Sequence, residues 1–345
     1  MISPFRVNKT NDRNEKIRSN TSFVRDVFYT EDLQRAARLS ELAYTPFDTA
    51  SHSHPPTDAP QSFTFASLQR TGRLHFLGQT HAQAYIWIDE HSRVAYLVFR
   101  GTDSKRDFLS DLDIRRQNIG KEEGVLVHRG FLEQFTSVEP EIESFMRMHA
   151  DAFDEIICCG HSMGGALATI AAVYLETCDA SPTHQKEKEE KEEKEEYQRR
   201  DCICRCYTFG SPRVGNAAFA RFFEKRFSSS SRTGREKKAR SVRVFIVSDP
   251  VVHLPFSCRF QHVDKERGFD LTSSSVRKED EKYELRVHRC TNKCSLLFSC
   301  ISTMSLCHPL RHHDVSHYRK AMEALRTSTP KIEHAQVDEN THNSL

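Results

Sequence analysis

The sequence contains no apolar run as long as the roughly 18 residues that a membrane-spanning helix needs. Its most apolar stretches, 165–175 and 296–306, are both too short, so we expect no transmembrane segment. The first twenty residues are polar and lack the apolar centre of a secretory signal. The expected location is therefore cytoplasmic, or secreted if the N-terminus of the chain has been assigned wrongly.

An excess of charge of one sign is also lacking, because 50 Lys and Arg residues face 48 Asp and Glu residues and the net charge is +2. A nearly neutral chain has no strong field for holding polyphosphate, so nucleic acid is not an expected partner. The 11 cysteines are odd in number, and Cys202, Cys204 and Cys206 alternate along the chain. This pattern favours reduced thiols over a disulfide framework.

Two segments have almost no apolar residues: KEKEEKEEKEE at 186–196 and SSSSRTGREKK at 228–238. Neither can bury enough surface to offset chain entropy, which predicts solvated insertions at about 183–200 and 228–240. A docking strip for a protein partner is the less favoured interpretation. We expect one domain over 30–326, between disordered tails at 1–29 and 327–345.

Helices and strands are expected to alternate after a β-rich start. Apolar residues at helical spacing predict helices at about 31–43, 131–150, 166–175 and 315–326. Runs of β-branched and aromatic residues predict strands at 63–68, 74–78, 82–88, 94–99, 155–159, 202–209 and 242–247. This order predicts an α/β fold with a mostly parallel central sheet flanked by helices.

The sequence GHSMG at 160–164 lies between a predicted strand and a predicted helix. This is the setting of the nucleophile elbow of lipases and esterases. The turn holds Ser162 in a strained backbone conformation, and side chains at 160 or 164 would collide with the adjoining strand and helix. An ordinary glycine-rich turn is the less favoured interpretation, and Ser162 is the predicted nucleophile.

A serine hydroxyl becomes a good nucleophile when a histidine takes its proton and a carboxylate orients that histidine. In α/β-hydrolases the acid follows the serine along the chain and the histidine comes last. Asp249 directly follows an apolar strand and precedes Pro250, whereas Asp264 and Asp270 follow no comparable strand. Asp249 is therefore the predicted acid.

The histidine has several candidates near the end of the chain: His308, His312, His313 and His317. Asp314 suits the N-cap of the last helix, which leaves His313 in the loop just before it and favours His313 over His312. A zinc site with Cys294, Cys300 and Cys307 is disfavoured, because C-x5-C-x6-C is not a standard zinc spacing. No metal or cofactor is expected.

These residues resemble the class 3 lipases, the fungal-lipase-like branch of the α/β-hydrolases. The resemblance covers about 30–326. Its motifs, in chain order, are VFRGT at 98–102, DFLSDL at 107–112, VHRGF at 127–131, GHSMGG at 160–165, TFGSPRVGN at 208–216, SDPVVHLP at 248–255 and HDxxxY at 313–318. The TFGSPRVGN string is the most specific of them.

The resemblance implies an α/β-hydrolase fold with Ser162, Asp249 and His313 as a catalytic triad. It implies an oxyanion hole made by Thr102, through its backbone N–H and hydroxyl, and by the backbone N–H of Met163. It also implies that the amphipathic stretch after Thr102 is a lid. The implied lid residues are Asp107, Phe108, Leu109 and Leu112.

Two features depart from the family's pattern. Phe108 stands where the lid usually has Trp, and the signal peptide and disulfides of secreted members have no counterpart. The implied activity is a cofactor-free serine lipase or esterase that hydrolyses acyl esters of triacylglycerol-like lipids and touches lipid surfaces transiently. The alternatives are a phospholipase A1 or galactolipase, a feruloyl-type esterase, or an inactive lipase-like binding protein.

Overall fold

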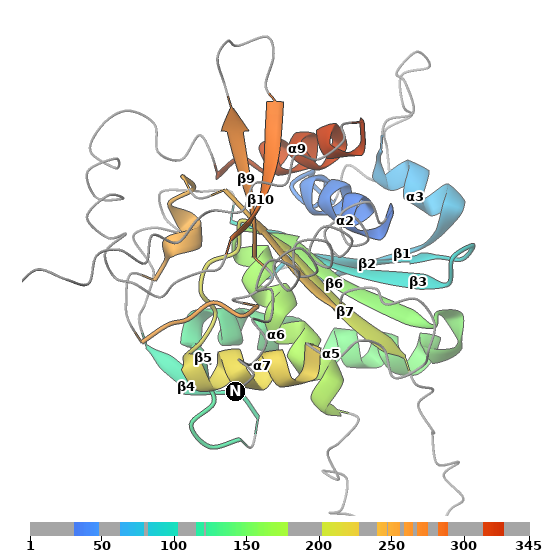
Figure 1. Cartoon of the computed structure of the whole chain (residues 1–345). Coiled ribbons are helices and arrows are strands. Elements are labelled where there is room, and N and C mark those ends of the chain that lie inside the picture. The colour runs from blue at the N-terminus through green and yellow to red at the C-terminus, as the bar shows by residue number, and fades with distance from the viewer. Residues whose placement is uncertain are drawn as a thin grey trace, which may run out of the picture.

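The computed structural model describes residues 31–47, 63–78, 82–102, 115–120, 122–178, 202–227, 240–246, 248–255, 259–264, 268–274, 282–288 and 313–327. The main strands are β1 (Gly72–Leu77), β2 (Ala84–Asp89), β3 (Val94–Phe99), β6 (Glu155–His161), β7 (Ile203–Phe209), β8 (Ser241–Phe245), β9 (Gly268–Ser274) and β10 (Lys282–His288). Within these ranges they form one sheet of eight strands in the order β1-β2-β3-β6-β7-β8-β9-β10 (Figure 1). A separate hairpin joins β4 (Arg116–Asn118) to β5 (Leu126–His128).

The middle of the sheet is parallel, as the sequence predicts. β3, β6, β7, β8 and β9 pair in parallel, whereas β1, β2 and β3 pair antiparallel, and so do β9 and β10. The carboxyl ends of parallel strands meet at one edge of a sheet. The chain after His161 in β6 and the chain after Phe245 in β8 therefore leave the sheet at the same edge.

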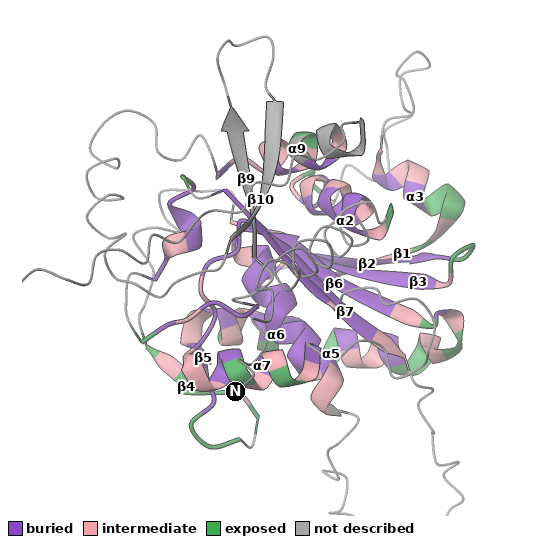
Figure 2. Cartoon of the chain, in the orientation of Figure 1, coloured by how far each residue is buried: buried purple, intermediate pink, exposed green. Residues whose placement is uncertain are grey.

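Helices cover both faces of the sheet (Figure 1). One layer holds α5 (Arg129–His149), α6 (Met163–Cys178) and α7 (Ala217–Phe227), and the other holds α2 (Glu31–Leu42), α3 (Phe65–Thr71) and α9 (Val315–Thr327). Side chains alternate between the two cores along β6: Ile156 and Cys158 face the first layer, and Ile157 and Cys159 face the second. The buried residues of Figure 2 accordingly run through the central strands and the inner sides of both layers.

The strand expected at 63–68 is wrong, because the chain there forms the helix α3. Its start is fixed by a reciprocal pair of hydrogen bonds. The Ser67 N–H donates to Thr64 Oγ1 at 3.2 Å, and the Thr64 N–H donates to Ser67 Oγ at 3.0 Å. This capping box satisfies the first backbone donors of the helix and overrides the β preference of the Phe-Thr-Phe sequence.

The helices expected at 31–43, 131–150, 166–175 and 315–326 are confirmed as α2, α5, α6 and α9. The hairpin β4–β5, the helix α7 and the strands β9 and β10 were not expected from the sequence. None of the helices in the described ranges is long and apolar enough to cross a bilayer.

The predicted tails and charged insertions lie outside the described residues, but the points where the insertions join the fold are described. One leaves the end of α6 at Cys178 and returns at the start of β7. The other leaves the end of α7 at Phe227 and returns at the start of β8. Since β7 and β8 are parallel to β6, both insertions join the edge of the sheet opposite to Ser162.

Candidate active site

Ser162 occupies the turn between β6 and α6 with a left-handed backbone conformation, φ 59°. Side chains rarely adopt this conformation, and the cost is met by surrounding hydrogen bonds. The Ser162 N–H donates to the Phe209 carbonyl at 2.9 Å, and the Ser162 carbonyl accepts from Gly165 at 2.9 Å. The strained backbone expected for a nucleophile elbow is therefore present.

The glycines on either side of Ser162 are required by close contacts. A Cβ on Gly160 would lie 2.4 Å from the carbonyl of Gly164, and a Cβ on Gly164 would lie 2.2 Å from the carbonyl oxygen of Phe99. Both distances are far below contact distance, so the expected collision with helix and strand is confirmed. The absence of these side chains lets α6 approach β3 and β6 and fixes the position of the serine.

The structure brings Ser162, Asp249 and His313 together, although they are far apart in the sequence. His313 Nε2 lies 2.7 Å from Ser162 Oγ, and His313 Nδ1 lies 2.7 Å from Asp249 Oδ2. Ser162 and His313 are each 3% exposed, and Asp249 is 0% exposed. When Nδ1–H donates to the carboxylate, Nε2 carries no proton and can accept a hydrogen bond from the serine hydroxyl.

Three donors hold the carboxylate of Asp249 in its buried place. Oδ1 accepts the N–H of Val251 at 2.9 Å. Oδ2 accepts from His313 and also from the hydroxyl of Tyr318, at 2.6 Å. Because the group cannot rotate without breaking these bonds, the plane of the His313 ring is fixed as well.

Two side chains hold the loop that follows Asp249: the half-buried Arg213 and the buried His262. Arg213 donates to the carbonyls of His253 and Pro255, the latter at 2.9 Å. His262 Nε2 lies 2.6 Å from the carbonyl of Val252. Burial, together with the nearby charges of Arg243 and Arg213, lowers the pKa of His262 well below its usual value, so the neutral ring donates to the carbonyl.

His313 is placed by the beginning of α9. The side chain of Asp314 accepts the N–H of Ser316 at 2.9 Å, as expected for a residue that caps this helix. Tyr318 lies in the first turn of the same helix, so the beginning of α9 places both the histidine and the tyrosine that contact Asp249. The alternative histidine, His312, lies outside the described residues.

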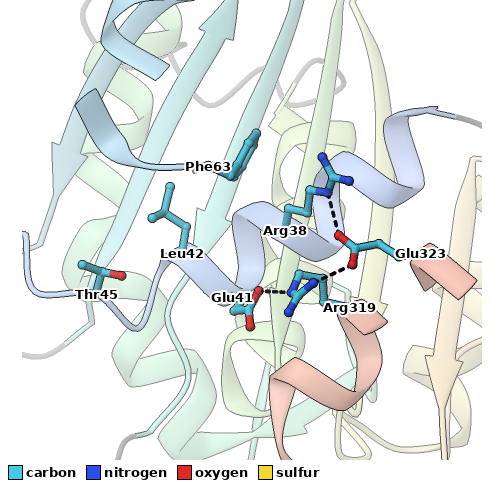
Figure 3. A pocket seen from close by; sticks show the side chains of 7 residues that line it. All are labelled: Arg38, Glu41, Leu42, Thr45, Phe63, Arg319 and Glu323. Carbon is cyan, nitrogen blue, oxygen red and sulfur yellow. Dashed lines mark hydrogen bonds and ion pairs between the residues drawn. The ribbon is translucent and has the colours of Figure 1, made fainter. Parts of the chain in front are cut away.

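Ion pairs join α9 to α2 (Figure 3). Arg319 pairs with Glu41 of α2 and with Glu323 at 2.5 Å, and Glu323 also pairs with Arg38 of α2 at 3.1 Å. A cavity of about 420 Å³ opens here, lined by Arg38, Glu41, Leu42, Thr45, Phe63, Arg319 and Glu323. Its described lining contains no triad residue, so it is separate from the catalytic centre.

The imidazole of His161, next to the serine, makes a further contact. Tyr44 Oη lies 2.8 Å from His161 Nδ1, and the His161 ring lies 4.6 Å from the His313 ring. No role was expected from the sequence for Tyr44, His161 or Tyr318. Only Tyr318 carried a signal, its spacing from His313; Tyr44 follows α2 with no pattern that points to the site.

The two residues expected to form an oxyanion hole are neighbours in space. Thr102 lies just beyond the carboxyl end of β3, and Met163 opens α6 directly after Ser162. The hydroxyl of Thr102 donates to the sulfur of Met163 at 3.2 Å. The expected lid residues lie outside the described part of the chain: Asp107, Phe108, Leu109 and Leu112.

Four buried cysteines of the described ranges are free thiols: Cys158, Cys159, Cys204 and Cys206. Burial raises the pKa of the Cys159 thiol to about 12, so this group is neutral. In the same ranges, no three His, Cys, Asp or Glu side chains meet in a way that could hold a metal. The residues of the alternative zinc site, Cys294, Cys300 and Cys307, lie outside them.

Comparison with known proteins shows that part of the chain is similar to a family of lipases. Residues 96–258 match the family described as lipase (class 3). Secreted mono- and diacylglycerol lipase 1 of Fusarium solani is 30% identical over 195 residues, 56% of this chain and 49% of the relative. Secreted mono- and diacylglycerol lipase A of Penicillium cyclopium is 27% identical over 190 residues, 54% of this chain and 52% of the relative. The chain thus spans about half the length of these relatives.

The fold is also similar to that of solved lipase structures. The crystal structure of Lip2 lipase from Yarrowia lipolytica matches with a TM-score of 0.53 at 20% identity, covering 81% of this chain and 92% of that one. The sheet and helix layers are those of an α/β-hydrolase. The family match over residues 96–258 and these fungal lipase relatives support a class 3 lipase family.

The comparisons overturn the expected cytoplasmic location, since the two fungal relatives are both named as secreted enzymes. That expectation depended on the polarity of residues 1–20, which lie outside the described part of the chain. The composition of that stretch was too narrow a basis for assigning a compartment.

Proposed function

We propose that this protein is a serine lipase that hydrolyses acyl esters of glycerol lipids through an acyl-enzyme intermediate. The observation that carries the proposal is the buried hydrogen-bonded chain from Asp249 through His313 to Ser162, with 2.7 Å at each step. This chain of hydrogen bonds ends at Ser162, whose strained backbone directly precedes the helix α6. The relatives' names, mono- and diacylglycerol lipase, support a glyceride as substrate.

In the first step Ser162 Oγ attacks the ester carbonyl while His313 Nε2 takes its proton. Asp249 orients the ring and stabilises the imidazolium that forms. The negative charge on the carbonyl oxygen is met by the backbone N–H groups of Thr102 and Met163 and by the Thr102 hydroxyl. His313 then returns the proton to the leaving alcohol, and water repeats the sequence on the acyl-enzyme.

The lid and the lipid surface belong to the same proposal. The segment 103–115 alternates apolar and charged residues at helical spacing and directly follows Thr102. Closed in water, its apolar side covers the catalytic centre; at a lipid surface it turns toward the acyl chains. The contact with lipid is transient, and no cofactor takes part in the reaction.

The test measures hydrolysis of a p-nitrophenyl ester series, a triacylglycerol emulsion and phospholipid vesicles by the wild type and Ser162→Ala. We expect the emulsion to be the best lipid substrate and the variant to lose on the order of 10⁶ in turnover. Circular dichroism and thermal unfolding should show that the variant is folded. If the folded variant keeps more than a few per cent of the activity, Ser162 is not the nucleophile. Faster hydrolysis of the vesicles identifies a phospholipase instead.

A further inference from the structure

The hydroxyl of Thr102 has an unusual acceptor in the resting enzyme. It donates to the thioether sulfur of Met163 at 3.2 Å. The backbone N–H of Met163 is the other proposed oxyanion donor, so the side chain of one donor residue holds the hydroxyl of the other. A thioether is a weak acceptor. The hydroxyl can therefore leave the sulfur at little cost when charge develops on the ester oxygen.

Met163 is also within reach of small solutes. It is the first residue of α6, is partly exposed and packs against the core. By contrast, Met146 and Met322 are 4% and 1% exposed. Met148 is 70% exposed, but it lies in the last turn of α5, just before the chain enters the amino end of β6. Among the described methionines, accessibility and nearness to Ser162 coincide at Met163.

We propose that Met163 is an oxidation site through which peroxide switches off the oxyanion hydroxyl of Thr102. The inference rests on the proposed function and deepens it, because it assigns a chemical control to the same catalytic centre. When Met163 is reduced, the Thr102 hydroxyl leaves the sulfur and donates to the oxyanion in the transition state. When Met163 is oxidised, the Thr102 hydroxyl stays hydrogen-bonded to the sulfoxide.

The covalent step needs only a peroxide. The sulfur attacks one oxygen of hydrogen peroxide, a sulfur–oxygen bond forms and the oxygen–oxygen bond breaks. The sulfur loses two electrons, the peroxide gains them, and the second oxygen leaves as water. The product is methionine sulfoxide, whose polar S–O group replaces an apolar thioether and which methionine sulfoxide reductases convert back.

The sulfoxide oxygen is a much stronger hydrogen-bond acceptor than the thioether, and it stands within reach of the Thr102 hydroxyl. Turning that hydroxyl toward the substrate then breaks a good hydrogen bond. The contact to the oxyanion exists only in the transition state, so its loss lowers kcat and leaves KM unchanged. Removing one oxyanion donor costs roughly 10²–10³ in kcat in a comparable hydrolase. Because the two backbone donors remain, we expect a fall of about tenfold or more here.

The experiment treats the purified protein with hydrogen peroxide, quenches with catalase and measures kcat and KM on p-nitrophenyl butyrate below its solubility limit. Peptide mass spectrometry quantifies sulfoxide at Met163 and Met148. The variants are Met163→Leu, which keeps the backbone N–H but has no oxidisable sulfur; Thr102→Val, which keeps the backbone N–H but has no hydroxyl; and the exposed control Met148→Leu. Each variant is compared with its own untreated rate.

We expect the wild type and Met148→Leu to lose kcat in step with sulfoxide at Met163, with KM constant, and to recover it with methionine sulfoxide reductases A and B and dithiothreitol. Met163→Leu and Thr102→Val should keep their own untreated rates. The inference is overturned if Met163 is oxidised and kcat persists, if Met148 is fully oxidised while Met163 stays reduced, or if either variant is inactivated like the wild type. Failure of the proposed function is recognised separately, because the hydrolysis rate without peroxide would then be the same in the wild type and in Ser162→Ala.

Discussion

The hydroxyl of Tyr318 donates a 2.6 Å hydrogen bond to Oδ2 of Asp249, the carboxylate oxygen that also meets the His313 ring. Both Tyr318 and Asp249 are 0% exposed. The orientation of Asp249 therefore depends on α9 as well as on its own loop. Since His313 directly precedes the same helix, a small shift of α9 would disturb the histidine and the acid at once.

Tyr318→Phe should lower kcat by about tenfold with little change in KM. A hydrogen bond to a charged group contributes about 1.5–3 kcal/mol, and about 1.4 kcal/mol is a factor of ten in rate. Tyr85→Phe is the matched control, because Tyr85 is as deeply buried and its hydroxyl donates at 2.7 Å to the Leu39 carbonyl of α2 instead of to a triad residue. Equal losses of kcat in both variants would mean that Tyr318 acts only on stability.

His313→Ala should remove turnover by several orders of magnitude, whereas His312→Ala should retain most of it. The reason is the 2.7 Å contact from His313 Nε2 to the serine hydroxyl. Both variants are assayed on the same dissolved ester, with thermal unfolding as the check on folding. A larger loss at position 312 would shift the assignment of the base by one residue.

Arg319→Met should lower the free energy of unfolding by about 1 kcal/mol, because it breaks two partly buried ion pairs. One pair joins Arg319 to Glu41 of α2, and the other joins it to Glu323 in the next turn of α9. The effect should shrink in 1 M salt, where charge interactions are screened. Arg73→Met is the control, since the Arg73–Glu90 pair is more than half exposed on both sides and should contribute nothing measurable. Urea unfolding of the three proteins gives the comparison, and a loss that is independent of salt would assign the role of Arg319 to packing.

Phe108→Asp should abolish interfacial activation. Activity of the wild type on a short-chain ester is expected to rise several-fold once substrate exceeds its solubility limit, because the apolar side of the segment 103–115 can then contact the surface of the undissolved ester. The variant should show no rise and an almost unchanged rate on dissolved substrate. A smooth hyperbolic curve for the wild type across the solubility limit would falsify the lid hypothesis.

Local signals in the sequence were sufficient for the elbow. The strand, the GHSMG turn and the helix are contiguous, so their spacing predicts the strained serine that φ 59° shows. Asp314 likewise marks the beginning of α9 and thereby the loop with His313. The roles of Ser162, Asp249 and His313 stay predictions, but the distances among them are those that the roles need.

Other features depend on contacts that no local pattern contains. The helix α3 forms because two side chains three positions apart exchange hydrogen bonds with each other's backbone, which outweighs a β-like composition. Tyr44 reaches His161 across 117 positions, so its place is set by the packing of α2 on the sheet. The strands β9 and β10 exist through pairing with each other and with β8.

The two charged insertions join the fold at the edge of the sheet opposite to Ser162. This arrangement makes them natural positions for engineering. Replacing 183–200 or 228–240 by a short glycine-serine linker, an affinity tag or a fluorescent label should leave substrate access untouched, because β7 and β8 begin at the opposite edge of the sheet from Ser162. An immobilised enzyme tethered there would present its catalytic edge outward, toward the emulsion.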